Sequence, residues 1–140
     1  MIIITGSTGA LGRIIIKELS QKYKLKSLSR RKPYKTIQNV EYLVGDLNSK
    51  SFLSKAFKDA KIVLHFAAET RSSNRDKLYN SNILLTSNIL EIMKKKGIKA
   101  LYFTSTILED VGLSNYSKSK LECSKIISIQ NQYFFKSYKI

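Results

Sequence analysis

Short runs of β-branched and other apolar residues recur along the chain and alternate with longer stretches whose apolar residues repeat at helical spacing. The short runs predict strands, and the longer stretches predict amphipathic helices. We predict strands at residues 1–4, 24–29, 40–44, 62–68 and 100–104, with one more at 133–138. We predict a first helix that ends near residue 23, followed by helices at residues 51–58, 78–96 and 116–130.

Strands that alternate with helices at these lengths indicate βαβ units. Because crossover connections are right-handed, the leading topology is an α/β fold: a doubly wound parallel sheet with helices on both faces. A chain of 140 residues suits a single domain, which we assign to residues 1–140.

Individual residues predict which face of the first helix is buried, where the second helix begins and where the third ends. The residues at helical spacing in the first helix predict a buried face made of Leu11, Ile14, Ile15 and Leu19. Asn48 or Ser49 is expected to cap the second helix, and Gly97 is expected to end the third.

Three glycines with the spacing G-x-x-G-x-x-G separate the first strand from the first helix. Gly6 permits a tight turn, Gly9 lets the backbone approach a pyrophosphate, and Gly12 lets the helix pack close to the sheet. The helix N-terminus attracts the anion. A plain turn is the alternative, but this order of elements predicts a Rossmann-like dinucleotide site formed by Gly6, Ser7, Thr8, Gly9, Ala10, Leu11 and Gly12.

The end of the second strand bears on which dinucleotide binds. An NAD-specific site requires Asp or Glu there, to accept from the ribose 2′-hydroxyl. The chain has Ser29, Arg30 and Arg31 instead. An arginine guanidinium suits a 2′-phosphate. The alternative interpretation is a solvated basic turn that binds no ligand. We therefore predict NADP as the cofactor, with NAD as the alternative.

The net charge of +15 comes mostly from lysines spread along the whole chain. Since no nucleic-acid motif accompanies it, we expect no nucleic-acid partner, although the field favours anionic ligands. No run approaches ~20 apolar residues and no basic region precedes the first strand, so we expect neither membrane association nor a signal peptide. The single cysteine, Cys123, fits a reducing compartment, and we expect a cytoplasmic protein.

Tyr116 and Lys120 lie four residues apart and share one face of the last predicted helix. A phenol ordinarily titrates near ~10, and a neighbouring ammonium lowers that pKa. The pair is a candidate general acid/base unit. Ser105 and Thr106 follow the fifth strand, where a hydroxyl either binds a substrate oxygen or caps the next turn.

His65 and Cys123 are the only residues of their types. We interpret His65 as a packed residue with a satisfied ring and Cys123 as a buried structural thiol, because neither has a visible catalytic partner. No Cys/His set has metal-ligand spacing, so we predict no metal site.

Taken in order along the whole chain, these features resemble the extended short-chain dehydrogenase/reductase superfamily and, within it, the NAD(P)-dependent epimerase/dehydratase family. The matching positions, besides the glycine turn, are Asp46, the His65–Ala68 strand end, Asn82–Ile83, Asn88–Leu90, Thr104–Thr106, Tyr116, Ser119 and Lys120.

The resemblance implies a role for each matched residue. Tyr116 would be the catalytic acid/base, and Lys120 would hold the nicotinamide ribose and tune Tyr116. Thr106, with Ser105 as the fallback, would bind the substrate oxygen. Hydride would pass between the nicotinamide and a carbonyl or alcohol carbon of a small molecule such as a nucleotide sugar. The other residues implied in cofactor binding are Asp46, Leu47, Phe66, Ala67, Ala68, Asn82 and Thr104.

Two departures from the family pattern keep a second function open. The segment between Thr106 and Tyr116 is short, and it lacks the Tyr-Gly and Pro common in the family. Most of the family's carboxyl-terminal substrate region is lacking, so we expect a fragment, a truncated product or a chain completed by a partner. The alternative function is a nonenzymatic dinucleotide-binding or redox-sensing module. The resemblance also implies a homodimer through the helices around residues 82–96 and 116–130.

Overall fold

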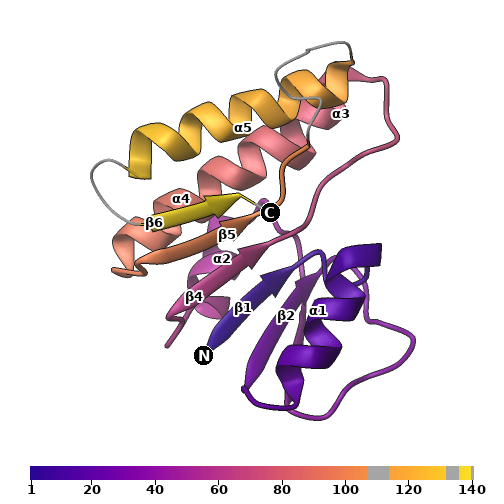
Figure 1. Cartoon of the computed structure of the whole chain (residues 1–140), viewed down its shortest axis with the longest axis vertical. Helices are drawn as coiled ribbons and strands as arrows, with labels where there is room; N and C mark the ends of the chain where they lie inside the picture. Colours follow the sequence, from indigo (N-terminus) through magenta and orange to yellow (C-terminus); the bar gives the residue numbers. More distant parts are fainter. Residues whose placement is uncertain (107–113, 132–135, 140) are drawn as a thin grey trace.

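A computed structural model describes residues 1–106, 114–131 and 136–139. Within these residues, six parallel strands form one sheet in the order β3-β2-β1-β4-β5-β6 (Figure 1). The strands are β1 (Ile2–Thr5), β2 (Leu25–Ser29), β3 (Val40–Val44), β4 (Ile62–His65), β5 (Ala100–Phe103) and β6 (Lys136–Lys139). This order confirms the doubly wound parallel sheet, with the topological switch point between β1 and β4.

Helices cover the sheet at positions close to those predicted. They are α1 (Ala10–Ser20), α2 (Lys50–Ala56), α3 (Arg75–Leu78), the π-helical segment η1 (Tyr79–Leu84), α4 (Leu85–Lys95) and α5 (Asn115–Asn131). Ser49 Oγ accepts a hydrogen bond from the Phe52 N–H at 3.3 Å, so Ser49 is the residue that caps α2. Gly97 follows α4 with φ +66°, the left-handed conformation expected at a helix end.

Successive residues of the strands face two separate apolar cores. Ile3 of β1 and Val63 of β4 pack in the larger core, together with apolar residues of α2, α4 and α5. Their neighbours Ile4 and Leu64 pack in the smaller core with Ile16 of α1. Because side chains alternate across a strand, the two cores lie on opposite faces, and helices cover both. In Figure 1, α4 and α5 run side by side.

The predicted buried face of the first helix is wrong in part. Leu11 is 39% exposed and Ile14 is 64% exposed, whereas Ile16 is buried. The reason is Gly12, where a Cβ would lie 2.2 Å from the Gly6 carbonyl oxygen. Gly12 must therefore face the sheet, which turns the positions one helical turn later, such as Ile16, inward.

The predicted helix at residues 78–96 begins earlier and is not one regular helix. It starts as α3 at Arg75, where the Asn74 side chain accepts from the Lys77 N–H at 2.8 Å, and it passes through η1 before α4 begins. The spacing of apolar residues predicts a helix here but does not distinguish a π-helical turn from an α-helical one. Such segments often occur at functional sites.

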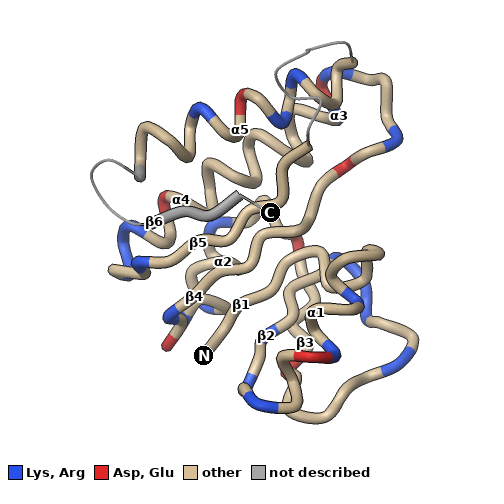
Figure 2. Tube along the Cα trace, viewed as in Figure 1, with Lys and Arg blue, Asp and Glu red and all other residues tan. Residues whose placement is uncertain are grey.

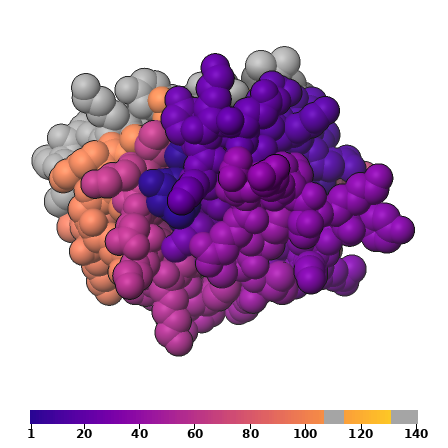
Figure 3. Space-filling view, turned by 90° about the horizontal axis from the view of Figure 1, so that it is seen from below, coloured from indigo at the N-terminus to yellow at the C-terminus, as the bar shows by residue number. Residues whose placement is uncertain are grey.

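Lysines and arginines are distributed over several helices and connecting segments (Figure 2). A second view shows one face built mainly from the indigo-to-magenta part of the chain, which holds β1 to β4, with the orange residues near β5 at one side (Figure 3). In the described ranges, no helix is both long enough and apolar enough to cross a bilayer.

Candidate functional site

The three glycines of the first turn have different surroundings. A Cβ on Gly6 would lie 2.4 Å from the Ala67 nitrogen, and one on Gly12 would collide with the turn itself. A Cβ on Gly9 would meet only the Gly6 oxygen, at 3.3 Å. Gly9 is also the N-cap of α1, and it supplies no side-chain cap to the free N–H groups of the first helical turn. The turn therefore packs tightly at its two ends and is less crowded at Gly9.

A cleft of about 230 Å³ lies over this turn, at the carboxyl ends of the strands. Ten residues predicted to bind the cofactor line it: Gly6, Thr8, Gly9, Ser29, Arg30, Asp46, Leu47, Phe66, Ala67 and Ala68. Five further lining residues were not predicted: Leu28, Asn48, Glu69, Ser81 and Leu85. Glu69 could have been found from its position directly after the fourth strand, but Ser81 and Leu85 reach the cleft only through the packing of η1 and α4.

The other predicted cofactor residues lie outside the lining of this cleft. They are Ser7, Ala10, Leu11, Gly12, Arg31, Asn82, Thr104, Tyr116 and Lys120. Ser7 is buried, and its hydroxyl lies 2.6 Å from that of Ser27. The Arg31 carbonyl accepts a hydrogen bond from Ser29 Oγ at 2.6 Å. The structure thus separates Arg30, which lines the cleft, from Arg31, which does not.

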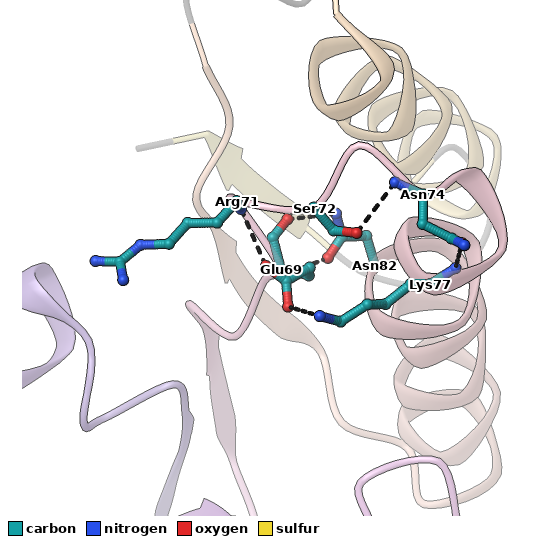
Figure 4. Close-up of polar contacts among 6 residues, drawn as sticks. All are labelled: Glu69, Arg71, Ser72, Asn74, Lys77 and Asn82. Atoms are coloured by element: carbon teal, nitrogen blue, oxygen red, sulfur yellow. Dashed lines mark hydrogen bonds and ion pairs between the residues drawn. The ribbon is translucent and has the colours of Figure 1, made fainter.

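Asn82 joins the segment after β4 to helix α5. Its side-chain oxygen accepts from the Glu69 N–H at 2.7 Å, and its amide nitrogen donates to the Glu69 carbonyl at 3.1 Å and to Ser119 Oγ at 2.9 Å. Asn82 is only 2% exposed, and these protein contacts use both of its N–H donors and one acceptor position of its oxygen. Figure 4 shows Asn82 beside Glu69. Asn82 therefore shapes the cleft wall through Glu69.

Two further groups contact the Glu69 carboxylate. One oxygen accepts from the Arg71 N–H at 3.0 Å, and the other lies 3.3 Å from the Lys77 ammonium (Figure 4). The hydrogen bond from the Arg71 N–H has the largest effect on the pKa of Glu69 and lowers it. Burial opposes this effect, and the hydrogen bond and charge of Lys77 lower the pKa further. An ionised, anchored carboxylate therefore stands at the edge of the cleft.

His65 lies at the centre of a buried hydrogen-bond chain. The Ala67 N–H donates to Thr5 Oγ1, which lies 2.7 Å from His65 Nδ1. His65 Nε2 lies 3.0 Å from Thr86 Oγ1, and that hydroxyl donates to Cys123 Sγ at 3.5 Å. A neutral His65 ring donates from one of these nitrogens and accepts at the other, so both hydroxyl contacts can be hydrogen bonds.

This environment keeps His65 neutral. Burial, and secondarily the charge of Lys120, lower the pKa of His65 to about 3. Both ring nitrogens are bonded and Cys123 is buried, as the sequence predicted for these two residues.

Tyr116 and Lys120 both lie on α5 but differ in environment. Lys120 is 2% exposed, and its ammonium lies 3.9 Å from the centre of the Phe103 ring. Tyr116 is half-buried, and burial, with a smaller effect of Cys123, raises the pKa of its phenol above the ordinary value. The expected lowering of this pKa by Lys120 is therefore not found. Thr104, Ser105 and Thr106 are half-buried after β5, and residues 107–113 lie outside the described residues.

The chain is similar to known proteins over most of its length. The chain is 33% identical over 110 residues to a putative dihydroflavonol 4-reductase of Synechocystis sp., which covers 74% of this chain and 32% of that protein. It is 32% identical over 125 residues to a putative UDP-glucose 4-epimerase of Methanocaldococcus jannaschii, with 83% and 41% covered. The chain thus spans less than half of these curated relatives.

Solved structures agree on the fold. The UDP-glucose 4-epimerase of Thermus thermophilus in complex with NAD superposes with a TM-score of 0.87 at 22% identity, covering 99% of this chain and 53% of that one. The profile described as the NAD dependent epimerase/dehydratase family matches residues 2–130. The chain therefore belongs to the NAD-dependent epimerase/dehydratase family of extended short-chain dehydrogenases/reductases.

Proposed function

We propose that this chain binds a nicotinamide dinucleotide in the cleft over the glycine turn. The observation that carries the proposal is the contrast at the turn. A Cβ on Gly6 or Gly12 would collide with backbone, whereas one on Gly9, beside a helix N-terminus with no side-chain cap, would meet only the Gly6 oxygen. Free N–H groups and the helix dipole suit a pyrophosphate there. The cleft also lies at the switch point of the sheet, where open α/β sheets bind ligands.

Gly9→Ala tests this proposal, with NADPH and NADH fluorescence as the readout. The added methyl group would meet only the Gly6 carbonyl oxygen, at 3.3 Å. The variant should therefore stay within about 1 kcal/mol of the parent in stability but bind either dinucleotide on the order of tenfold more weakly. Unchanged affinity in a folded Gly9→Ala variant, or no binding by the parent chain, would overturn it.

The cofactor that we propose is NADP rather than NAD. Arg30 lines the cleft directly after β2, and Ser29 rather than a carboxylate ends that strand. Several solved relatives are complexes with NAD, so the proposed preference for NADP rests on Arg30. Competitive titration of NADPH against NADH measures it, and equal affinities that Arg30→Ala leaves unchanged would contradict it.

We further propose an oxidoreductase, epimerase or dehydratase activity in which Tyr116 is the acid/base. Lys120 would hold the nicotinamide ribose, and Thr106 or Ser105 would bind the substrate oxygen. The bound dinucleotide supplies hydride chemistry. Relatives are described as a putative UDP-glucose 4-epimerase and as a protein in complex with UDP-glucuronic acid and NAD, so nucleotide sugars are the substrates to try first. Tyr116→Phe should abolish turnover while dinucleotide binding persists.

A nonenzymatic dinucleotide-binding module is the second candidate. The raised pKa of Tyr116 favours it, because a phenol that stays protonated is a poor base at neutral pH. Dinucleotide binding without turnover of any carbonyl or nucleotide-sugar substrate would support this second candidate over the enzyme.

We also propose a homodimer through the helices around residues 82–96 and 116–130. The paired helices α4 and α5 lie side by side in Figure 1, and α5 carries Ile129, which is 60% exposed. Light scattering after gel filtration measures the mass, and Ile129→Lys should shift a dimer toward monomer. A monomeric parent chain would contradict this assembly.

A further inference from the structure

The three connections that lead from a helix into β2, β4 and β5 are rich in lysine. They are residues 21–24, 57–61 and 96–99. Each connection carries two exposed lysines, which are Lys22 and Lys24, Lys58 and Lys61, and Lys96 and Lys99. Asp59 is the only carboxylate in these three connections. In Figure 2, blue segments lie at the starts of β2, β4 and β5, along the end of the sheet where the N-terminus lies.

The parallel sheet brings these lysines together although they are far apart in the sequence. The first residues of β2, β1, β4 and β5 are in register with one another. Lys24, Lys61 and Lys99 each come directly before the first residue of a strand, so they lie in one row across the sheet. Because neighbouring strands are about 5 Å apart, Lys61 lies about 5 Å from Lys99 and about 10 Å from Lys24 along this row.

The other three lysines widen the row to both sides of the sheet. Lys22 follows α1, which packs in the smaller core, whereas Lys58 and Lys96 follow α2 and α4, which pack in the larger core. Since the two cores lie on opposite faces of the sheet, the six lysines are spread over an area and not along a line. A charged surface matches this arrangement better than a single extended chain of phosphates does.

Most of this positive charge has no partner within the protein. Within residues 1–106, 114–131 and 136–139, none of five of these lysines takes part in an ion pair: Lys22, Lys24, Lys58, Lys61 and Lys96. Tyr23 is 52% exposed between two of them, and amphipathic rings of this kind gather at the headgroup level of a bilayer. The three connections contain no arginine, the residue that most often reads nucleic-acid bases.

We propose that this end of the sheet, made of the six lysines, binds the surface of a membrane that contains anionic lipids. Each ammonium group near such a surface attracts the anionic headgroups. The dinucleotide cleft lies at the carboxyl ends of the strands, so it faces away from the membrane and stays accessible. The sequence alone predicts no membrane association because these lysines are spread from residue 22 to residue 99.

Cosedimentation with vesicles tests this proposal. The parent chain should bind vesicles of equal parts phosphatidylserine and phosphatidylcholine, and added salt should weaken this binding. The triple variant Lys24→Gln/Lys61→Gln/Lys96→Gln removes one lysine from each connection. Its binding should be weaker on the order of a hundredfold, since each lysine near an anionic surface accounts for roughly fivefold.

The matched control is Lys32→Gln/Lys35→Gln/Lys118→Gln, which removes the same charge from exposed lysines outside the three connections. These lysines belong to the segment between β2 and β3 and to α5. The control should bind the anionic vesicles within about threefold of the parent chain, because charges more than about 10 Å from the surface are screened. All six substituted positions are exposed, so both variants should fold, which circular dichroism checks.

Three results would overturn the proposal. They are equal weakening in the two triple variants, equal binding of the parent chain to vesicles of phosphatidylcholine alone, and tighter binding of mixed-sequence duplex DNA than of the anionic vesicles at equal phosphate concentration. The last result would identify a nucleic acid as the partner. The membrane proposal does not depend on the proposed dinucleotide function. NADPH titration of the parent chain tests that function separately, and its failure would leave the vesicle result unchanged.

Discussion

The ammonium nitrogen of Lys120 lies 3.9 Å from the centre of the Phe103 ring, in a position where Lys120 is almost fully buried. A cation over an aromatic face is stabilised by the ring quadrupole, by about 2 kcal/mol when the pair is desolvated. Because Phe103 ends β5 and Lys120 lies on α5, this contact holds the helix that carries Tyr116 against the sheet.

Replacing Phe103 by leucine should therefore cost more than the loss of ring volume. Phe57→Leu is the control, because Phe57 is a buried ring of the same core that makes no such contact in the described structure. We expect the free energy of unfolding, measured in urea, to fall about 2 kcal/mol further for Phe103→Leu than for Phe57→Leu. Equal losses would show that the contact between Lys120 and the Phe103 ring does not stabilise the protein.

The lowered pKa of His65 makes stability depend on pH. The ring binds a proton near its ordinary pKa of 6.5 in the unfolded chain, but only near 3 in the folded protein. As pH falls below 6.5, the unfolded state alone gains the proton, and stability should fall by about 1.4 kcal/mol per pH unit.

The window from pH 6.5 to pH 5 isolates His65. Glu69 and Glu91 also have lowered pKa values, so their contributions are lost only as pH falls below their ordinary value of 4.5. Urea midpoints between pH 7 and pH 5 measure the slope. His65→Gln is the control: it should be less stable than the parent at pH 7 but lack the slope, because His65 is the only histidine. A parent chain with no slope in this window would contradict the neutral buried ring.

Gly12 and Gly9 should respond differently to alanine. At Gly12 the new Cβ would lie 2.2 Å from a backbone oxygen, which the turn cannot accommodate without moving. We expect Gly12→Ala to lose several kcal/mol, about 3 or more, whereas Gly9→Ala stays within about 1 kcal/mol of the parent. Thermal unfolding monitored by circular dichroism compares the two, and similar losses would refute the assigned packing.

Asn82→Ala should destabilise the protein by about 2–4 kcal/mol, because it leaves the part-buried N–H and carbonyl of Glu69 without this partner and removes the hydrogen bond that Ser119 Oγ accepts. Asn80→Ala is the matched control, since Asn80 is exposed in the same π-helical segment. Urea unfolding measures both. An Asn82→Ala variant as stable as Asn80→Ala would mean that the bridge contributes nothing.

Much of this fold can be predicted from local sequence. The apolar run at residues 40–44 predicts β3 with its observed bounds, and the strand–glycine–helix order predicts the turn around Gly9. These features depend on near neighbours: side-chain alternation, helical spacing and the small size of glycine. The α/β class and the cleft at the glycine turn follow from them.

Contacts between segments far apart in the sequence determine the features that local sequence does not predict. Ile14 belongs by spacing to an apolar stripe, but the collision that a Cβ would cause at Gly12 turns it toward solvent. Arg30 and Arg31 are indistinguishable in sequence, yet only Arg30 lines the cleft.

The sequence by itself determined most of the elements, the parallel sheet and the position of the glycine turn, because these follow from local periodicity and from residue size. Only the tertiary structure decided how the candidate catalytic residues lie. Burial raises the pKa of Tyr116, and Lys120 packs on Phe103 beside a neutral His65. Desolvation and long-range packing set those properties, and neither can be read from the four-residue spacing of Tyr116 and Lys120.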